Sequence, residues 1–382
     1  MTIIIKYYDN NIEHSYDNFK DVKNSLNYDN IHTICMKIEN IKFITKLPNR
    51  LVILRCDACR LISLPKFPDT LKEISCYSNH LTSLSKLPDG LERLSCNYNN
   101  IYKLPELSDK LKILSCSGNR IVEIPQLPNS LTELYCWNNK LSSLPKLPDS
   151  LVELNCSDNK LVCLQELPNS LIYLWSNHNN LSTLPELPNS LIKLRCDNNI
   201  ISSLPEIPNL LHTLCCHNNN LSSLPELPNS LIILWCNQNK ISSLPKLPKS
   251  LIHLDCANND LSSLPALPNS LTHFTCEDNL LTEICIYLPY NIIEFNCVSN
   301  KLEILPIALH PIKYICHDNP IYDRVCNIYG DIQNYMIIRQ SYYKNMCNKI
   351  GNWYLECKYN PKYEQCRKKL KLEYEELYGI SV

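Results

Sequence analysis

A 20-residue repeat constrains the fold of this chain more than any other feature. From Leu51, twelve segments of 20 residues follow one another without insertion or deletion, and two further units begin at Ile292 and Pro311, each after a shift of one residue. Residues 31–50 are a degenerate earlier copy. A fixed period of this length is typical of a solenoid, in which each unit forms one layer and buries its apolar side chains only against its neighbours.

The unit has the pattern LxxLxCxxNxLxxLPxLPxS, which is clearest in residues 131–150. Its apolar positions 1, 4, 6, 11, 14 and 17 fit neither a sustained helical period nor a long alternating strand. Proline at positions 15 and 18 removes two backbone donors and favours an extended, polyproline-like back to the unit. Because an extended back is thinner than a helix, we expect a gently curved solenoid.

Asparagine recurs at position 9 in thirteen of the fourteen units, and Cys59 is the exception. We expect these side chains to turn inward, where the amide donors and acceptor can satisfy backbone groups of their own and the adjacent unit. Without such partners, those backbone groups would be buried unpaired. The predicted Asn ladder consists of Asn79, Asn99, Asn119, Asn139, Asn159, Asn179, Asn199, Asn219, Asn239, Asn259, Asn279, Asn300 and Asn319.

Cysteine is the second recurrent residue, since thirteen of the 22 Cys lie at position 6. One interpretation is a row of small buried hydrophobic residues, and the other is a metal or redox ladder. Metal sites need local clusters of three or four ligands, and only Cys56 and Cys59 form a CxxC pair, so we favour the core and expect no metal and no cofactor. A row of free thiols also predicts a reducing, cytoplasmic location.

The pattern LxxLx(L/C)xxNxL, over roughly residues 31–324, resembles the leucine-rich repeat. The short unit with its Leu-Pro-x-Leu-Pro half is similar to the subclass found in secreted effectors of bacterial pathogens. Similar repeats, in chains rich in Asn, Ile, Lys and Tyr, are typical of the giant DNA viruses that infect amoebae (mimivirus type), and we interpret the chain as a protein of that kind. The resemblance implies a β-rich solenoid with short parallel strands at positions 3–5 on a concave face and extended convex segments.

The repeat divides the chain into an N-terminal cap at residues 1–30, a solenoid of about 14–15 units at residues 31–324, and a helical C-terminal cap or tail at residues 325–382. Capping is the expected role of the ends, because a solenoid must cover its terminal apolar layers. In the N-terminal cap, residues 2–8 predict a strand and residues 15–26 a short helix with Ser15 as its N-cap. The expected turn and C-terminal helices lie at residues 9–11, 330–348 and 363–378.

The family resemblance also implies that positions 3, 5, 7 and 8 face outward on the concave side and form columns along the stack. Three of the four Trp lie in these columns, and Trp, Tyr and Arg are the residues most enriched at binding hot spots. The alternative is that these aromatic side chains only pack on one another along the strands. The predicted partner-binding residues are Tyr135, Trp137, Tyr173, Trp175, Arg195, His217, Trp235, His253 and His273.

Several classes of function find no support in the sequence. Bacterial effectors with this repeat often carry a ubiquitin-ligase domain with a nucleophilic Cys-x-Asp, but no cysteine after residue 320 has Asp two residues later. Phosphate-loop, HExxH, GxSxG and kinase signatures are absent from the sequence, so we predict no enzyme and no catalytic residue. The net charge of −1 argues against nucleic acid, and no stretch reaches the roughly 18 apolar residues that predict a membrane span.

The leading hypothesis is therefore a non-catalytic recognition module that binds a protein partner, such as a host protein, on its concave face. One alternative is a structural or assembly component that packs through the sides and caps of the solenoid. Another is a substrate adaptor whose tail docks a ubiquitin-ligase complex. The oligomeric state is not defined by the sequence.

Overall fold

Each repeat unit contributes one three-residue strand to a continuous sheet. In the computed structural model, the strand occupies positions 3–5 of the unit, as the resemblance implied. The strands are β4 (Ile53–Arg55), β5 (Glu73–Ser75), β6 (Arg93–Ser95), β7 (Ile113–Ser115), β8 (Glu133–Tyr135), β9 (Glu153–Asn155), β10 (Tyr173–Trp175), β11 (Lys193–Arg195), β12 (Thr213–Cys215), β13 (Ile233–Trp235), β14 (His253–Asp255), β15 (His273–Thr275), β16 (Glu294–Asn296) and β17 (Lys313–Ile315).

The structure describes residues 2–7, 13–25, 27–37, 44–285, 287–308 and 312–329, together with residues 335, 337, 338 and 341. The predicted turn at residues 9–11 lies outside these residues. The predicted helix at 363–378 does so as well, and so does most of the predicted helix at 330–348.

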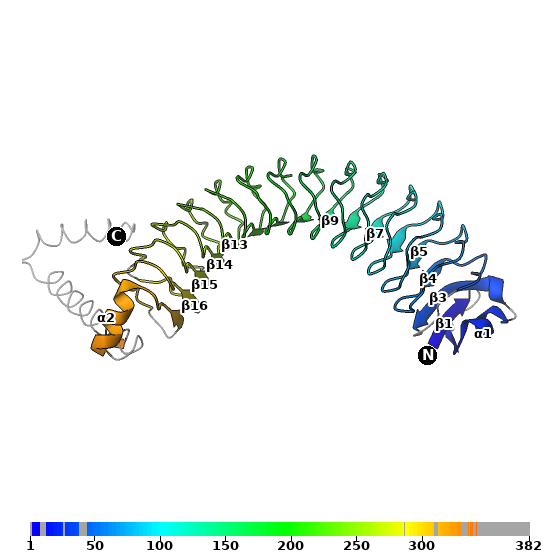
Figure 1. The fold of residues 1–382 in the computed structure, drawn as a ribbon, viewed down its shortest axis with the longest axis horizontal. Coiled ribbons are helices and arrows are strands. Elements are labelled where there is room, and N and C mark those ends of the chain that lie inside the picture. The colour runs from blue at the N-terminus through cyan, green and yellow to red at the C-terminus, as the bar shows by residue number, and fades with distance from the viewer. Residues whose placement is uncertain are drawn as a thin grey trace, which may run out of the picture.

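The strands pair in parallel and in register, so that each position faces the same position of the next unit. Leu174, for example, pairs with Leu154 on one side and with Leu194 on the other. In-register stacking carries every side chain of the unit into a column that runs the length of the molecule. The rungs follow one another along an arch whose inner edge is formed by the strands (Figure 1).

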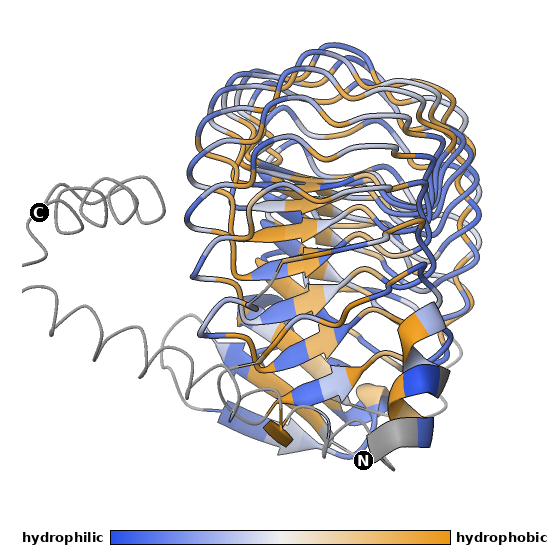
Figure 2. Ribbon diagram, turned by 90° about the vertical axis from the view of Figure 1, so that its left-hand side faces the viewer, coloured by the Kyte–Doolittle hydropathy of each residue, from blue (hydrophilic) through white to orange (hydrophobic). Residues whose placement is uncertain are grey.

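The core lies between the strands and the convex backs. Positions 1, 4, 6 and 11 are fully buried in the unit that contains Leu151, Leu154, Cys156 and Leu161, and the same holds in nearly all other rungs. Figure 2, which looks along the stack, shows hydrophobic residues at the same places in successive rungs. One unit could not bury these side chains alone, so each rung is stabilised by its two neighbours.

The backs of the rungs are held together less tightly than the strands. Backbone hydrogen bonds between rungs recur from position 2 to position 11, whereas between positions 12 and 19 they are few, such as the 3.4 Å bond from Ser202 N–H to Ser182 C=O. The arch in Figure 1 is more pronounced than the gentle curve expected from thin backs. We attribute this to the missing donors of the proline-rich backs, which leave strand spacing enforced on the inner edge alone.

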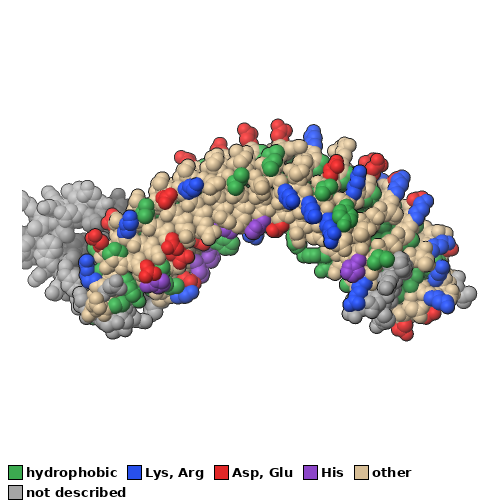
Figure 3. Space-filling view, viewed as in Figure 1, with side chains coloured by type: hydrophobic (Ala, Val, Ile, Leu, Met, Phe, Trp, Pro, Cys, Tyr) green, Lys and Arg blue, Asp and Glu red, His purple; other side chains and the backbone are tan. Residues whose placement is uncertain are grey.

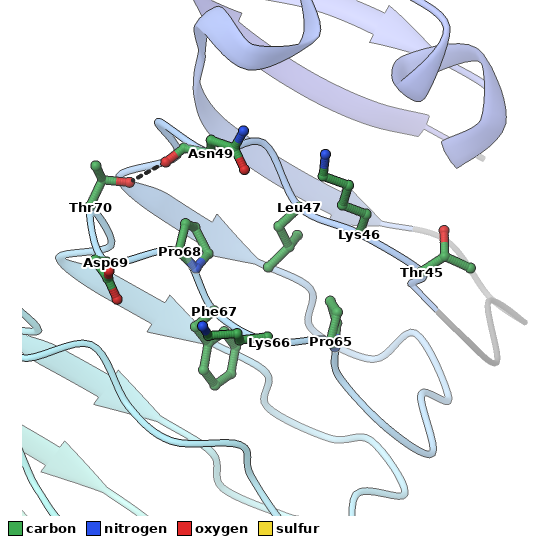
Figure 4. A pocket seen from close by; sticks show the side chains of 10 residues that line it. All are labelled: Thr45, Lys46, Leu47, Asn49, Pro65, Lys66, Phe67, Pro68, Asp69 and Thr70. Atoms are coloured by element: carbon green, nitrogen blue, oxygen red, sulfur yellow. Dashed lines mark hydrogen bonds between the residues drawn. The ribbon is translucent and has the colours of Figure 1, made fainter.

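Shallow hollows between successive backs are a consequence of this spacing. Figure 4 shows the hollow between the degenerate first copy and the next unit, lined by Leu47, Pro65 and Phe67 among others, with Thr70 Oγ1 donating to Asn49 C=O at 3.2 Å. Equivalent hollows recur at the same positions of later rungs. Their repetition identifies them as a property of the stack and not as a specific ligand site.

The N-terminal cap closes the first rung with an antiparallel unit. It consists of β1 (Thr2–Tyr7), β2 (Glu13–Tyr16), α1 (Phe19–Lys23) and the short 3-10 helix η1 (Tyr28–Asn30), and it leads into β3 (Ile31–Lys37) of the degenerate copy. Strand β1 pairs antiparallel with both β2 and β3, and β3 continues in parallel into β4. The degenerate copy therefore supplies the first parallel strand of the solenoid.

The predicted helix over residues 15–26 is wrong at its start. Ser15 lies in β2, where it pairs with Ile4, and the helix spans only residues 19–23. Its N-cap is Asn18, whose side-chain oxygen accepts from Asp21 N–H at 2.9 Å. Residues 13–16 form a strand because they pair with the edge of β1, whose backbone groups would otherwise face solvent on that side. The helix can begin later because Asn18 caps it as well as Ser15 would.

The last rung is followed by α2 (Pro320–Tyr329). Proline at its first position suits a helix start, because that N–H would be unpaired anyway. Ile321 and Val325, one turn apart, are 8% and 2% exposed in the hydrophobic core. Among the described residues, none of the helices combines the length and apolar composition that crossing a bilayer requires.

Candidate functional site

A sharp turn after each strand shapes the rim of the concave face. Position 8 has a positive φ in all fourteen rungs, from 50° at Asn218 to 63° at Gly118. Asn, Asp and Gly tolerate this left-handed conformation best, which explains why they are frequent at position 8. This turn was not predicted from the sequence, although the recurrence of Asn and Asp at position 8, beside the Asn ladder, is a signal for it.

The Asn at position 9 fixes this turn to the preceding rung. Asn159 Nδ2 lies 3.0 Å from Cys136 C=O, 3.1 Å from Cys156 C=O and 3.0 Å from Ser157 C=O, and its Oδ1 accepts from Leu141 N–H at 3.0 Å. The same arrangement recurs from Asn79 to Asn319. These side-chain amides use their donors and acceptor for hydrogen bonds to backbone groups of two rungs. Their role is therefore to hold the concave face rigid.

The cysteines of position 6 lie behind the strands, in the core. All thirteen are buried and free, and Cys156 Sγ donates a weak hydrogen bond to Trp175 C=O at 3.4 Å. Burial raises the pKa of Cys96 and of Cys156 to about 12, which keeps these thiols protonated at neutral pH. Within the described part of the chain, no group of three or more His, Cys, Asp or Glu side chains could hold a metal ion.

The concave columns contain all nine residues that the sequence singled out for partner binding. Seven lie within the strands, and Trp137 and His217 follow at position 7. In Figure 3, hydrophobic and His side chains lie along the inner edge of the arch together with some charged ones, and acidic and basic side chains project along its outer edge. Six of the nine contact one another in pairs, namely Tyr173 with Trp175, His217 with Trp235 and His253 with His273. Tyr135, Trp137 and Arg195 contact residues outside the set.

Two tryptophans dominate the middle of the face. Trp175 stacks on Tyr173, with ring centroids 5.8 Å apart, and the Lys193 ammonium lies 5.8 Å from the Trp175 ring centroid. Trp235 meets His217 edge to face at 6.4 Å and is 40% exposed. A large aromatic surface, exposed on a rigid sheet beside a cation, is typical of a protein-binding hot spot.

Between these tryptophans, the carboxylate of Asp197 is 1% exposed. Arg195 Nε lies 3.3 Å from its Oδ1, while His217 Nε2 at 3.5 Å and Asn198 Nδ2 at 3.0 Å approach its Oδ2. These partners compensate the cost of burying the charge. Asp197 was not predicted as a site residue, because its position in the repeat does not show that His217 of the next rung packs against it. We call the group the central cluster: Trp175, Lys193, Arg195, Asp197, His217 and Trp235.

Cys215 forms the floor of the central cluster and is covered by its neighbours. It faces the concave side between Arg195 and Trp235, its strand neighbours in register, and is only 2% exposed. Burial raises its pKa to about 11, although the charge of Arg195 opposes the shift. A protonated, covered thiol is a poor nucleophile.

A second aromatic group lies nearer the N-terminal end, at positions 7 and 8. Tyr98 contacts Tyr77 at 5.4 Å and Trp137 at 5.5 Å, both edge to face. It reaches Trp137 across Gly118, where an added Cβ would lie 2.8 Å from the Tyr98 ring. The two tyrosines were missed because only the glycine between the rungs allows this contact.

Tyr135 and the histidine pair complete the predicted set. The Tyr135 hydroxyl donates to Glu133 Oε2 at 3.1 Å, and burial, followed by the Glu153 carboxylate, raises its pKa. His253 and His273 stack with ring centroids 4.5 Å apart. Burial, and secondarily the charge of His273, lowers the pKa of His253.

Comparison with known proteins places this geometry in a family. No protein-family model matches the sequence, and the search of curated proteins gave no match. YopM from Yersinia enterocolitica is 32% identical, with a TM-score of 0.68 over 75% of this chain and 69% of that chain. YopM from Yersinia pestis, a leucine-rich effector protein, is 33% identical, with a TM-score of 0.64 over 75% of this chain and 88% of that chain.

A more distant structure shares the fold at 23% identity. It is a chain of the octameric complex of Latrophilin 3, Unc5D and FLRT2, in which FLRT2 contributes its leucine-rich repeats, and its TM-score is 0.51 over 61% of this chain and 83% of that chain. The strand at positions 3–5 of each unit and the identity shared with YopM lead to one conclusion. The chain belongs to the leucine-rich repeat family.

Proposed function

We propose that this protein is a non-catalytic recognition module whose concave face, at the central cluster, binds a protein partner such as a host protein. The observation that carries the proposal is the exposure of Trp235, 40% open to solvent on a face whose backbone is fixed by the Asn ladder. An indole held in this way gains contact area on binding and loses little conformational freedom.

Similar structures support a role in protein interaction. One, YopM, is an effector protein, and the FLRT2 repeats form part of a complex with other proteins. Support also comes from the chemistry of the face, where Cys215 is covered and Asp197 is buried against Arg195 and His217. Neither group is placed to act on a substrate.

The test is affinity capture from amoebal lysate with the wild-type chain and with Trp175→Ala and Trp235→Ala, quantified by mass spectrometry. Each side chain is partly exposed and supports little of the core, so we expect the unfolding temperature to fall by no more than about 2 °C. Capture of the specific partner should fall at least about tenfold. Val122→Ala is the matched control, because Val122 is 57% exposed and lies at position 12, away from the concave columns.

Two outcomes would contradict the proposal. Capture of the same partner at wild-type yield by both tryptophan variants would remove the concave face from recognition. Self-association of the chain that is insensitive to these substitutions would instead favour a structural component that packs through the sides and caps.

We further propose that recognition takes place in a reducing compartment, and that the chain belongs to the short-unit subclass seen in giant viruses of amoebae. The thirteen free thiols at position 6 support the first part, because oxidising compartments favour disulfides. The constant 20-residue period with its Leu-Pro-x-Leu-Pro half supports the second.

A further inference from the structure

We infer that the central cluster recognises an extended segment of the partner with the chemistry apolar-x-acidic-x-apolar. The inference rests on the proposed function and specifies the partner's chemistry at the same site. It follows from the spacing of two tryptophans, the charges between them and the charges on either side.

The spacing matches an extended chain. Trp175 and Trp235 occupy the same position on β10 and β13, three rungs apart. Parallel strands lie about 4.8 Å apart, so the two positions are separated by about 14 Å. Four residues of extended chain span about 13.5 Å. A segment that runs along the arch, across the strands, therefore brings residues i and i+4 onto the two indoles.

The alternation of an extended chain then directs residue i+2 to the same face, between the tryptophans. There it lies between β11 and β12, within reach of Lys193 and Arg195 on β11. Within the described residues, the Lys193 ammonium contacts the Trp175 ring and makes no ion pair. Arg195 uses Nε for the buried Asp197, and no other hydrogen bond of its guanidinium is present in the described part of the chain.

These groups make the centre of the face cationic toward a ligand. The carboxylate of Asp197 is 1% exposed, so a partner meets Lys193 and Arg195 and not the buried acid. The neutral thiol of Cys215 adds no charge to the floor. A carboxylate at residue i+2 would form a charge-assisted hydrogen bond that an uncharged side chain cannot replace.

The flanks fix where along the arch the acidic residue can bind. Glu133 and Glu153 lie toward the N-terminal side of the cluster, and Asp255 and Glu277 toward the C-terminal side. An acidic residue placed over either flank would be repelled, since like charges disfavour the wrong register. The basic centre between acidic flanks therefore selects one register of the segment.

The first experiment is unbiased peptide display against the full chain. We expect the selected peptides to be enriched in Asp or Glu with an apolar residue two positions away on each side. Nine-residue synthetic peptides with a central Leu-x-Glu-x-Leu are then titrated by fluorescence anisotropy. Glu→Gln in the peptide, or insertion of one residue between Glu and the second Leu, should weaken binding at least about fivefold.

The second experiment is a double-mutant cycle that couples the peptide acid to Lys193. Lys193→Gln should weaken the Glu peptide about as much as the Glu→Gln change does, and should have little further effect on the Gln peptide. Lys240→Gln, which removes an exposed lysine outside the concave columns, is the matched control and should leave both affinities unchanged.

Each other outcome overturns a defined part of the argument. Selected peptides that need Trp175 and Trp235 but lack the central acid, or that tolerate the inserted residue, overturn this inference and leave the proposed function standing. Peptides indifferent to both tryptophans overturn the inference and the concave site together. If no peptide binds while capture of a folded partner still needs both tryptophans, recognition does not use an extended segment and the inference is wrong.

Discussion

At the scale of single residues, the most demanding position is the Asn of the ladder. Its amide must reach two rungs at once: Asn179 Nδ2 lies 3.1 Å from Cys156 C=O and from Ser176 C=O, while Oδ1 accepts from Leu161 N–H at 3.0 Å. A side chain of another length or without both kinds of group would leave buried backbone groups unpaired.

Asn179→Ala is therefore expected to destabilise the solenoid by about 3 kcal/mol, because several buried backbone groups lose their partners together. The measurement is urea unfolding followed by circular dichroism. The adjacent Asn180→Ala is the control, since Asn180 is exposed at position 10 and only its backbone N–H is bonded, to Leu161 C=O. Equal midpoints for the two variants would show that the ladder amides are not the groups that hold the turns.

At the scale of one structural element, the cysteine row links stability to pH. Burial raises the thiol pKa in the folded chain, to about 12 for Cys96 and for Cys156. The unfolded thiols titrate near pH 8.5, so above that pH the unfolded state binds fewer protons than the folded state does. The contribution is fully present below pH 8.5 and is lost as the pH rises toward 12, at about 1.4 kcal/mol per pH unit for each such thiol.

We expect the unfolding temperature to fall steeply between pH 8.5 and pH 10.5 in the presence of a reductant. A Cys96→Ala, Cys156→Ala double variant should be less stable at neutral pH. Its unfolding temperature should fall less steeply with rising pH, because two of the thiols that lose a proton on unfolding are absent. Parallel slopes for the variant and the wild-type chain would mean that other groups, such as Lys and Tyr, cause the alkaline loss.

The rung itself was the element that the sequence could predict best, and its neighbours show why. The 20-residue period predicts the strand at Glu133–Tyr135 and the burial of Leu134 and Cys136, because every unit has the same residue types at these positions and the same neighbours in the stack. The cap does not repeat: Ser15 could cap a helix or extend a strand, and only pairing with Ile4 decides between them. The contact of Tyr98 with Trp137 likewise depends on the missing side chain at Gly118, which no pattern of period 20 contains.

At the scale of the whole molecule, the stack behaves as a row of nearly identical modules. Each rung forms hydrogen bonds mainly with the rungs before and after it. Successive side chains in one concave column are therefore one rung apart. Stability is then close to a sum of unit and interface contributions, whereas recognition depends on the distance between particular rungs. The two properties can be separated by removing one complete unit.

Deletion of residues 211–230 removes β12, together with Cys215 and His217 of the concave face, and joins Leu210 to Leu231 without a change of position within the repeat. Arg195 would then lie beside Trp235, and the two tryptophans would be two rungs apart, about 10 Å. Deletion of residues 151–170 also removes one unit but leaves the spacing of the central cluster intact.

We expect both chains to fold, with unfolding temperatures that differ by a few degrees at most, because each has lost one unit and one interface. Only the first deletion should abolish capture of the partner. Binding retained by the first deletion, or lost equally from both, would show that the spacing of Trp175 and Trp235 does not determine recognition.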